Sequence, residues 1–238
     1  MTYEDIKILY EDNHLIVSLK PQGVPSQSDS SGDEDMLSLL KAYVKDKYSK
    51  PGDAYLGLVH RLDRPTGGVM VFARTSKAAA RLSDQIKDGT LQKRYLAVVT
   101  ARPGEKRARL THWLLKDGAT NLVKVVPMTT DGAKKAVLDY NVVEDNDENG
   151  LYLVDVKLHT GRSHQIRVQM ATIGCPIYGD VKYGKNQPNG AFSLWSYDLS
   201  FRHPTTDKLM SFRVFPPEKY PWTLFNLEKH IGIVKPRD

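Results

Sequence analysis

Hydrophobic positions in the first half of the chain change from strand-like runs to helix-like spacing. Residues 6–20 hold two short apolar runs around the turn formers Glu-Asp-Asn, a pattern that predicts a β-hairpin. Apolar residues within 35–48 recur at helical spacing, so we expect an amphipathic helix there. A second helix is predicted over 75–89, with Ser76 as its N-cap and Gly89 as its left-handed end.

Strand patterns dominate the second half of the chain. Apolar and alternating segments predict strands at 93–100, 134–144, 151–160, 192–201 and 208–217. One helix is predicted over 161–174, where Ile166, Met170 and Ile173 share a face. Because strands outnumber helices and short turns connect many of them, the pattern predicts an α+β fold with a largely antiparallel sheet.

Nothing in the sequence marks a boundary between domains, since it contains no internal repeat and no long linker. We therefore expect a single domain over 1–238. Residues 26–35 are small, polar and acidic, which is typical of a mobile surface loop. Residues 218–238 carry prolines and lysines and are expected to form a C-terminal tail.

The charge of the chain favours an anionic partner. Its 238 residues include 34 basic and 28 acidic side chains, a net charge of +6 at neutral pH, and nucleic acid is favoured over a membrane surface. The single cysteine, Cys175, excludes an internal disulfide and a zinc cluster built on several thiolates. The N-terminus lacks a signal-peptide pattern, and no apolar run approaches the roughly 20 residues that span a bilayer. We therefore expect a cytoplasmic protein.

Two charge-rich clusters interrupt the apolar strand pattern. The first, HRLDR at 60–64, stands between the apolar runs 57–59 and 68–73, and the second, 159–167, follows a predicted strand. Burying charged groups costs free energy unless they are paired or used. Asp63 therefore belongs either to a structural ion pair with the neighbouring arginines, which is the commoner case, or to a site where it acts as nucleophile or base toward an anionic substrate.

No motif for a cofactor or a catalytic metal accompanies these clusters. The chain lacks the phosphate-binding loop, the dinucleotide fingerprint, the zinc-binding helix and the nucleophile elbow. His60, His159 and His164 are each expected first as hydrogen-bonded structural residues. From the residues alone, an RNA-binding enzyme is only slightly favoured over a basic binding module.

Four motifs, in order along the chain, resemble the RluA family of pseudouridine synthases. They are LIVSLKPQGVPSQ, GLVHRLDRPTGGVMVFART, KRYLAVV and LHTGRSHQIRVQMATIGCPIYGDVKYG, and the resemblance extends from about Ile8 to Pro217. Gly67 stands where the family usually has serine, and Gln169 and Cys175 replace commoner histidines. No S4-type RNA-binding domain precedes the first motif, so we expect the catalytic domain itself to contact RNA.

The resemblance implies that the protein isomerises uridine within RNA. The N1–C1′ bond breaks, the base turns, and a C5–C1′ bond forms, without cofactor or metal. Asp63 matches the family's essential aspartate, which attacks C1′, acts on C6 of the base or abstracts the 2′ proton. Tyr95 matches a tyrosine that stacks on the target base and helps to remove the C5 proton, with a core aromatic as the alternative. Arg162 matches an arginine that pairs with the aspartate and keeps it ionised.

Further matching positions imply contacts to the substrate. Arg61 is expected to help hold the nucleotide with its base flipped out. Ile166 is expected to pack on the base, and a place in the core on the helix face is the alternative. The other expected substrate-binding residues are His60, Lys93 and Arg167. Salt-sensitive phosphate contacts are expected from Lys93, Arg94, Lys106, Arg107 and Arg109.

The fold implied by the resemblance is a central mixed, mainly antiparallel sheet with flanking helices, in two halves around a basic cleft. The expected substrate is ribosomal RNA, transfer RNA or both, bound by a monomer, with the acidic loop 26–35 facing away from it.

Two other functions stay open. A catalytically silent RNA-binding or assembly factor on the same scaffold is disfavoured by the intact set of Asp63, Tyr95 and Arg162. A hydrolase or nuclease that uses Asp63 with His60 is disfavoured because no second convergent carboxylate and no metal site accompany them.

Overall fold

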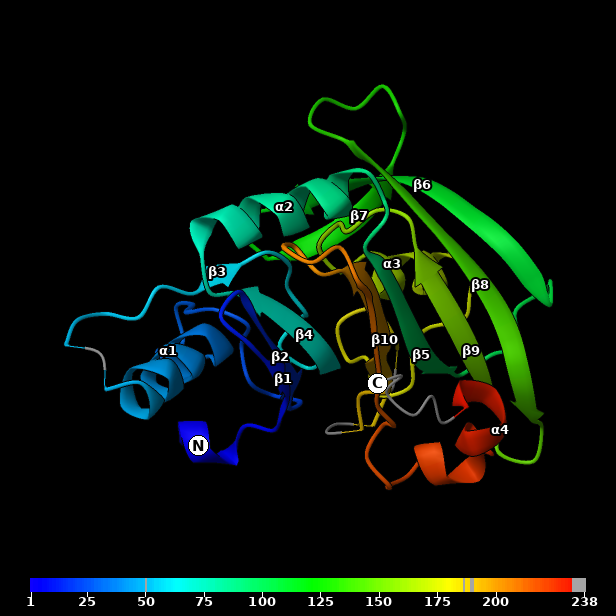
Figure 1. Cartoon of the computed structure of the whole chain (residues 1–238). Coiled ribbons are helices and arrows are strands. Elements are labelled where there is room, and N and C mark those ends of the chain that lie inside the picture. The colour runs from blue at the N-terminus through cyan, green and yellow to red at the C-terminus, as the bar shows by residue number, and fades with distance from the viewer. Residues whose placement is uncertain (50, 186, 189–190, 233–238) are drawn as a thin grey trace. The chain divides into compact units, whose positions relative to one another are not determined.

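The computed structural model describes residues 1–49, 51–185, 187–188 and 191–232, and the chain divides into two compact units (Figure 1). Within this range, unit 1 contains Met1–Gln92 without residue 50 and Ser196–Val214; unit 2 contains the described part of Lys93–Trp195 and residues 215–232. Each unit combines strands with a few helices, so the expected α+β fold class is confirmed. A single domain over 1–238 stays a prediction.

Unit 1 is built on strands in the order β1-β2-β4-β10-β11, with the short β3 paired to β4. Their bounds are β1 Ile8–Glu11, β2 Leu15–Lys20, β3 Gly57–Leu58, β4 Gly67–Ala73, β10 Leu194–Arg202 and β11 Leu209–Arg213. The hairpin predicted within 6–20 is confirmed as β1 and β2. Its turn is closed by the carboxylate of Asp12, which accepts hydrogen bonds from the backbone N–H groups of His14 and Leu15 at 2.7 and 2.9 Å.

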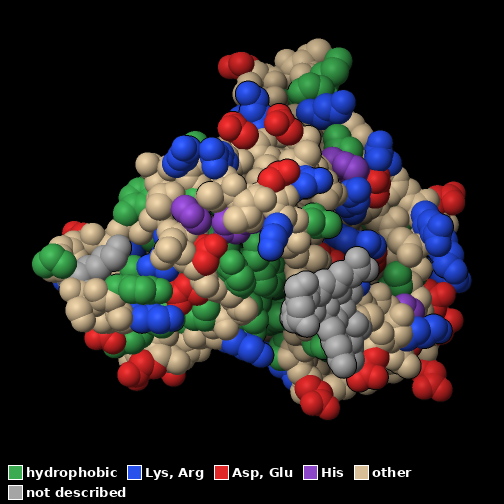
Figure 2. All heavy atoms as spheres, viewed as in Figure 1, with side chains coloured by type: hydrophobic (Ala, Val, Ile, Leu, Met, Phe, Trp, Pro, Cys, Tyr) green, Lys and Arg blue, Asp and Glu red, His purple; other side chains and the backbone are tan. Residues whose placement is uncertain are grey.

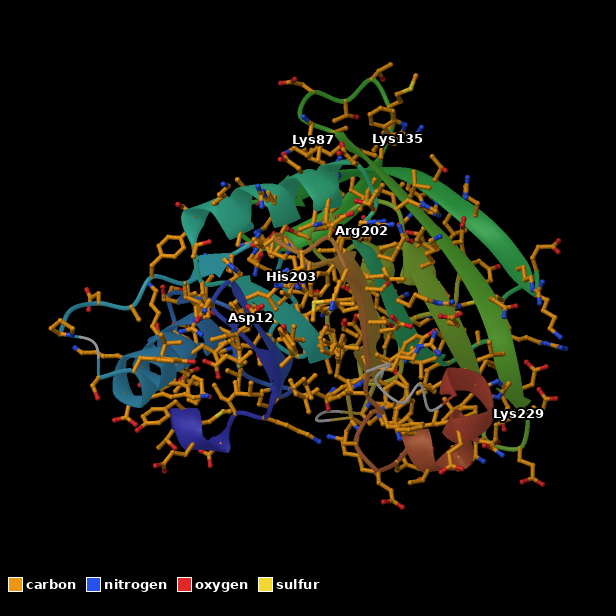
Figure 3. All side chains as sticks on the ribbon, in the orientation of Figure 1. Asp12, Lys87, Lys135, Arg202, His203 and Lys229 are labelled. Atoms are coloured by element: carbon orange, nitrogen blue, oxygen red, sulfur yellow. The ribbon has the colours of Figure 1, made fainter. Side chains whose placement is uncertain are left out.

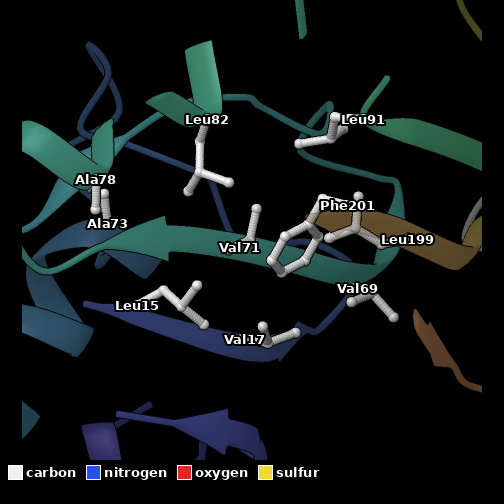
Figure 4. Close-up of a cluster of buried hydrophobic side chains, with 10 residues drawn as sticks. All are labelled: Leu15, Val17, Val69, Val71, Ala73, Ala78, Leu82, Leu91, Leu199 and Phe201. Atoms are coloured by element: carbon white, nitrogen blue, oxygen red, sulfur yellow. The ribbon is translucent and has the colours of Figure 1, made fainter. Parts of the chain in front are cut away.

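A cluster of buried apolar side chains fills the space between α2 (Ser76–Lys87) and the strands of unit 1 (Figure 4). Its members are Leu15, Val17, Val69, Val71, Ala73, Ala78, Leu82, Leu91, Leu199 and Phe201. The N-cap of α2 is Thr75, whose hydroxyl accepts from the N–H of Ala78 at 3.1 Å, so the prediction of Ser76 was wrong by one residue. Threonine and serine both cap well, and the sequence alone did not separate them. Gly89 adopts a φ of 72°, as expected for a left-handed helix end.

The acidic segment 26–35 is anchored at both of its ends. The backbone N–H of Met36 donates to the carbonyl of Pro25 at 2.9 Å, which brings the two ends of the segment together. Asp35 then caps helix α1 (Met36–Lys47) by accepting a hydrogen bond from the N–H of Ser38 at 3.0 Å.

Between these anchors, two carboxylates of the segment contact the residue that follows Asp63. Asp33 forms an ion pair with Arg64, and Asp29 lies 4.0 Å from the same guanidinium. The segment is therefore tied to the turn that carries Asp63, and its composition gave no sign of this contact.

Unit 2 contains antiparallel strands in the order β5-β9-β8-β6-β7. Their bounds are β5 Gln92–Val99, β6 Arg107–Asp117, β7 Leu122–Val126, β8 Lys134–Asn146 and β9 Leu151–Leu158. The strands predicted at 93–100, 134–144 and 151–160 are confirmed as β5, β8 and β9. The β6–β7 hairpin was missed, because β6 is mostly open to solvent and buries fully only Leu114, which leaves a weak apolar alternation.

Helix α3 (Gln165–Thr172) is four residues shorter at its start than the helix predicted over 161–174. Residues 161–164 instead form a turn, and His164 has a left-handed φ of 51°. The helix buries Val168 against Leu114 and other residues of the β6–β8 part of the sheet.

The segment predicted as a tail, 218–238, is structured over its described part. It forms a short 3-10 helix (Trp222–Leu224) and helix α4 (Leu227–Ile231), and Trp222 is only 1% exposed. The ring of His230 lies 2.7 Å from the carboxylate of Glu144 on β8. Residues 233–238 lie outside the described residues. Within the described ranges, none of the helices has the length and apolar character needed to cross a bilayer.

Candidate active site

Asp63 stands at the start of a tight turn between β3 and β4. Its carbonyl accepts a hydrogen bond from the N–H of Thr66 at 2.9 Å, which places Arg64 and Pro65 at the centre of the turn. Asp63 is partly exposed, whereas Leu62 before it and Thr66 after the turn are buried. The turn therefore exposes a carboxylate between buried neighbours, as the pattern of charge between apolar strands predicts.

The second residue of the strand after this turn is a glycine that a larger residue cannot replace. Gly68 has a φ of 127°, and a Cβ added there would lie 2.2 Å from the carbonyl oxygen of Ser196. The close approach of these two backbones fixes the point where the Asp63 turn ends.

His60 and Arg61 occupy different surroundings although they are adjacent. His60 is buried, and its Nε2 accepts a hydrogen bond from the N–H of Val71 at 3.1 Å, which gives the ring a structural function within unit 1. Arg61 is exposed and has no hydrogen-bond or ion-pair partner among the described residues, so it is available to an anionic substrate. Contact between His60 and the substrate stays a prediction that this burial does not favour.

A buried lysine behind the turn was missed by the sequence reasoning. Lys20, the last residue of β2, has no exposed surface, and its Nζ donates to the carbonyls of Pro21 at 2.9 Å and Arg64 at 3.0 Å. The available signal was a lysine at the end of the apolar run LIVSL, where the preceding residues are almost all buried.

In unit 2, β5 directs Lys93 and Tyr95 to one face of the sheet, because residues two apart along a strand share a face. Tyr95 is 5% exposed and pairs in register with the buried Val156 of β9. Lys93 is half-buried, burial lowers its pKa, and no described residue is its hydrogen-bond or ion-pair partner. Its Nζ lies beside Gly161, where an added Cβ would be 3.4 Å away. A desolvated ammonium without a partner is suited to bind an anion.

Arg162 lies in the turn that connects β9 to α3. Its backbone N–H donates to the side chain of Gln165, and its Nε donates to the carbonyl of Lys135, both at 3.0 Å (Lys135 is labelled in Figure 3). The side chain is exposed and has no carboxylate partner within the described part of the chain. Its other guanidinium nitrogens are therefore free of acidic neighbours in unit 2. Arg162 and Lys93 flank Gly161 from two elements.

Helix α3 carries two predicted substrate residues into the interior. Ile166 is 4% exposed. Arg167 is 6% exposed, and its Nε and Nη2 donate to the two carboxylate oxygens of Asp180 at 2.8 and 2.7 Å. The guanidinium also stacks over the rings of Tyr183 and Phe192, 5.1 and 5.0 Å from their centroids.

These contacts give Arg167 a structural function within unit 2. The family resemblance implied a substrate contact for Arg167, and no sequence pattern identified Asp180, 13 residues away, as its partner. A direct contact between Arg167 and RNA stays a prediction without support from this geometry.

The other basic residues of the sheet that were expected to bind phosphate, Arg94, Arg107 and Arg109, are not grouped with Lys93. Arg94 pairs with Asp155, and Arg109 donates to Asp139 at 2.6 Å, on the sheet face opposite to Lys93 and Tyr95. Arg109 lowers the pKa of Asp139 through this bond. Figure 2 shows Lys and Arg side chains interspersed with carboxylates on the visible face of unit 2. This is the pattern of a solvated, cross-strand paired face.

Unit 1 also holds a histidine–carboxylate pair outside the Asp63 turn. Nε2 of His203 lies 2.7 Å from the carboxylate of Asp12, and Nδ1 accepts from the N–H groups of Thr205 and Thr206 (Figure 3). This pair ties the β1–β2 turn to the segment after β10. In the described residues, no group of three or more histidine, cysteine or acidic side chains is arranged to hold a metal ion.

Comparison with known proteins places the chain in a family. Residues 14–172 match the family described as RNA pseudouridylate synthase. An uncharacterised RNA pseudouridine synthase of Aquifex aeolicus is 33% identical over 250 residues, covering 94% of this chain and 74% of that protein. The ribosomal large subunit pseudouridine synthase D of Zymomonas mobilis is 31% identical over 228 residues, covering 90% of this chain and 70% of that protein.

A solved structure shares the fold. Human RNA pseudouridylate synthase domain containing 4 superposes with a TM-score of 0.75 at 23% sequence identity, covering 92% of this chain and 91% of that one.

The chain therefore belongs to the RNA pseudouridine synthase family, as the four motifs indicated. Its members are isomerases, and this protein is an enzyme of that class.

Proposed function

We propose that the protein converts specific uridines of ribosomal RNA to pseudouridine with Asp63 as the catalytic carboxylate. The observation that carries this proposal is the Asp63 turn, in which a partly exposed carboxylate stands between two buried residues of unit 1. Three routes are compatible with such a carboxylate: attack on C1′, addition to C6, or removal of the 2′ proton. All three need an ionised aspartate held still beside the flipped-out nucleotide.

The isomerisation conserves the atoms of the nucleotide. In the route through C1′, the carboxylate forms a bond to C1′ while the N1–C1′ bond breaks and its electron pair passes to the base. The turned base then bonds to C1′ through C5 as the carboxylate leaves, N1 takes up a proton, and the proton on C5 is removed, so the composition of the nucleotide is unchanged. Tyr95, on a rigid strand, is proposed to stack on the base and to help in that proton transfer.

For the basic residues, the proposed roles follow from exposure or from the lack of a partner among the described residues. Arg61 and Arg162 are exposed and lack acidic partners among the described residues, which suits them to hold the nucleotide and to balance the charge of Asp63. Lys93 is proposed to bind a backbone phosphate, because its ammonium is desolvated and unpaired. Ile166 is proposed to pack on the base.

The choice of ribosomal RNA rests on the relatives. Several carry names of ribosomal large subunit pseudouridine synthases, including those of Zymomonas mobilis and Rickettsia typhi. Transfer RNA stays the second expected substrate. We also propose that the protein acts as a monomer in the cytoplasm.

Release of tritium from RNA labelled at C5 of uridine tests the proposal, because formation of the C5–C1′ bond expels that hydrogen. Ribosomal and transfer RNA from cells lacking this protein are assayed separately. Release from ribosomal RNA alone supports the proposal. Release from transfer RNA alone would mean that transfer RNA, and not ribosomal RNA, is the substrate. Binding to both RNAs without release from either would favour the silent RNA-binding factor.

A further inference from the structure

The turn that carries Asp63 rests on a charged group with no access to solvent. Lys20 is completely buried, at the end of β2. An isolated ammonium in such a place is costly, so it is expected to be neutralised, hydrogen-bonded or put to use. Its Nζ donates to two carbonyls, one of them that of Arg64, 44 residues away and directly after Asp63.

The contact from Lys20 is one of several between the same two segments. The carbonyl of Arg64 also accepts from the N–H of Gly23 at 2.9 Å, and the side chain of Gln22 donates to the carbonyl of Pro65 at 3.2 Å. Residues 20–26 thus hold the backbone after Asp63 through three separate donors.

The backbone just before Asp63 is held from the same segment. The hydroxyl of Ser26, itself buried, donates to the carbonyl of Leu62 at 2.8 Å and accepts from the N–H of Leu62 at 3.1 Å. Both peptide neighbours of Asp63 are therefore fixed by residues 20–26, which we call the Lys20–Ser26 clamp.

The protonation of Lys20 is coupled electrostatically to Asp63. An ammonium has three donors, and two of them are taken by carbonyls. Two charged groups act on it: the carboxylate of Asp63 favours the protonated form, and the guanidinium of Arg64 opposes it. Burial is the largest effect and lowers the pKa of Lys20 to about 7.

We propose that Lys20 is a positioning residue for Asp63: through the Lys20–Ser26 clamp, its ammonium holds the turn in the conformation that presents the carboxylate to uridine. This inference rests on the proposed function of Asp63. It adds a residue that touches no substrate, and it gives a reason for a charged side chain in the core of unit 1.

The kinetics of Lys20→Met test the inference against a purely structural function. We expect kcat to fall about 100-fold, as for a misplaced catalytic group, with little change in KM for RNA. In the wild type, kcat falls as pH rises through about 7, where Lys20 loses its proton, and this limb is absent from Lys20→Met. Leu82→Ala, a destabilising change in the core of unit 1, is the control, and its kcat and pH profile stay those of the wild type.

If Lys20→Met does not fold, Ser26→Ala tests the inference instead. This variant removes the hydroxyl that binds the backbone N–H and carbonyl of Leu62. We expect a smaller fall in kcat, again without a rise in KM. If Lys20→Met and Ser26→Ala both fold and both have the kcat of the wild type, the inference is overturned. An inactive Asp63→Asn in the same assay still supports the proposed function. Full activity of Asp63→Asn overturns the proposed function instead.

Discussion

Arg167 and Asp180 form a buried, bidentate ion pair in unit 2, with nitrogen–oxygen distances of 2.8 and 2.7 Å. Asp180 is 1% exposed, and its carboxylate also accepts from the N–H groups of Lys182 and Tyr183 at 3.1 and 3.3 Å. The pair therefore joins α3 to the loop that follows it.

Loss of either partner is predicted to destabilise the protein more than it alters RNA binding. Arg167→Met leaves a buried carboxylate without its cation, and we expect about 3–5 kcal/mol of lost unfolding free energy. Urea unfolding measures the loss, and filter binding at a temperature where the variant is folded measures RNA affinity. The double variant with Asp180→Asn should recover part of the stability. A stable Arg167→Met with weak RNA binding would restore the substrate contact predicted from the sequence.

Lys93→Met is predicted to weaken RNA binding without loss of stability. The variant removes a desolvated cation that has no partner among the described residues, so folding gains rather than loses free energy. The slope of log affinity against log salt should fall by about 1, as for one lost phosphate contact.

Lys157→Met provides the matched control for Lys93. Lys157 is exposed on β9 and pairs in register with Arg94, so it projects from the opposite face of the same sheet. Equal loss of affinity in the two variants would show that net charge alone, and not the unpaired ammonium, sets the effect.

Asp33→Asn is predicted to tighten RNA binding. The carboxylate of Asp33 holds the guanidinium of Arg64 next to Asp63, and its removal frees that guanidinium for phosphate. Binding isotherms over a salt series measure the change. Asp207→Asn is the control, because Asp207 is also exposed and also pairs with an arginine, Arg202. Equal tightening in both would contradict a specific role of the acidic segment.

Lys20 is predicted to make the stability of the wild type rise with pH. Its pKa is about 7 when folded and 10.5 in the unfolded chain, so between these values the unfolded chain binds more protons. The unfolding free energy contributed by this group therefore increases with pH, by up to about 1.4 kcal/mol per pH unit. Urea unfolding of the wild type and Lys20→Met from pH 6 to pH 9 measures the difference. Parallel curves for the two proteins would contradict the shifted pKa.

The sequence predicted the Asp63 turn because its signal is local. Charged residues between two apolar runs indicate a turn flanked by buried segments. This can be predicted from the neighbouring residues alone, without knowing which distant segments pack against them. The same holds for the β1–β2 hairpin and for Gly89 at the end of α2.

Features that depend on distant partners were predicted poorly. The function of Arg167 depends on Asp180, and the burial of Lys20 depends on a turn 44 residues further along. The five basic residues assigned to phosphate looked equivalent in sequence, yet β5 sends Lys93 and Arg94 to opposite faces. Sequence patterns give the residue types, whereas the pairing of strands decides which of them have partners.

The most direct test of the account compares isomerisation by the wild type and Asp63→Asn under single-turnover conditions, with RNA affinity measured on the same preparations. The substitution keeps the size of the side chain and removes its charge. We predict no detectable tritium release from C5-labelled RNA by Asp63→Asn, with an affinity close to that of the wild type. Release by Asp63→Asn at the wild-type rate would contradict the assignment of Asp63 as the catalytic carboxylate.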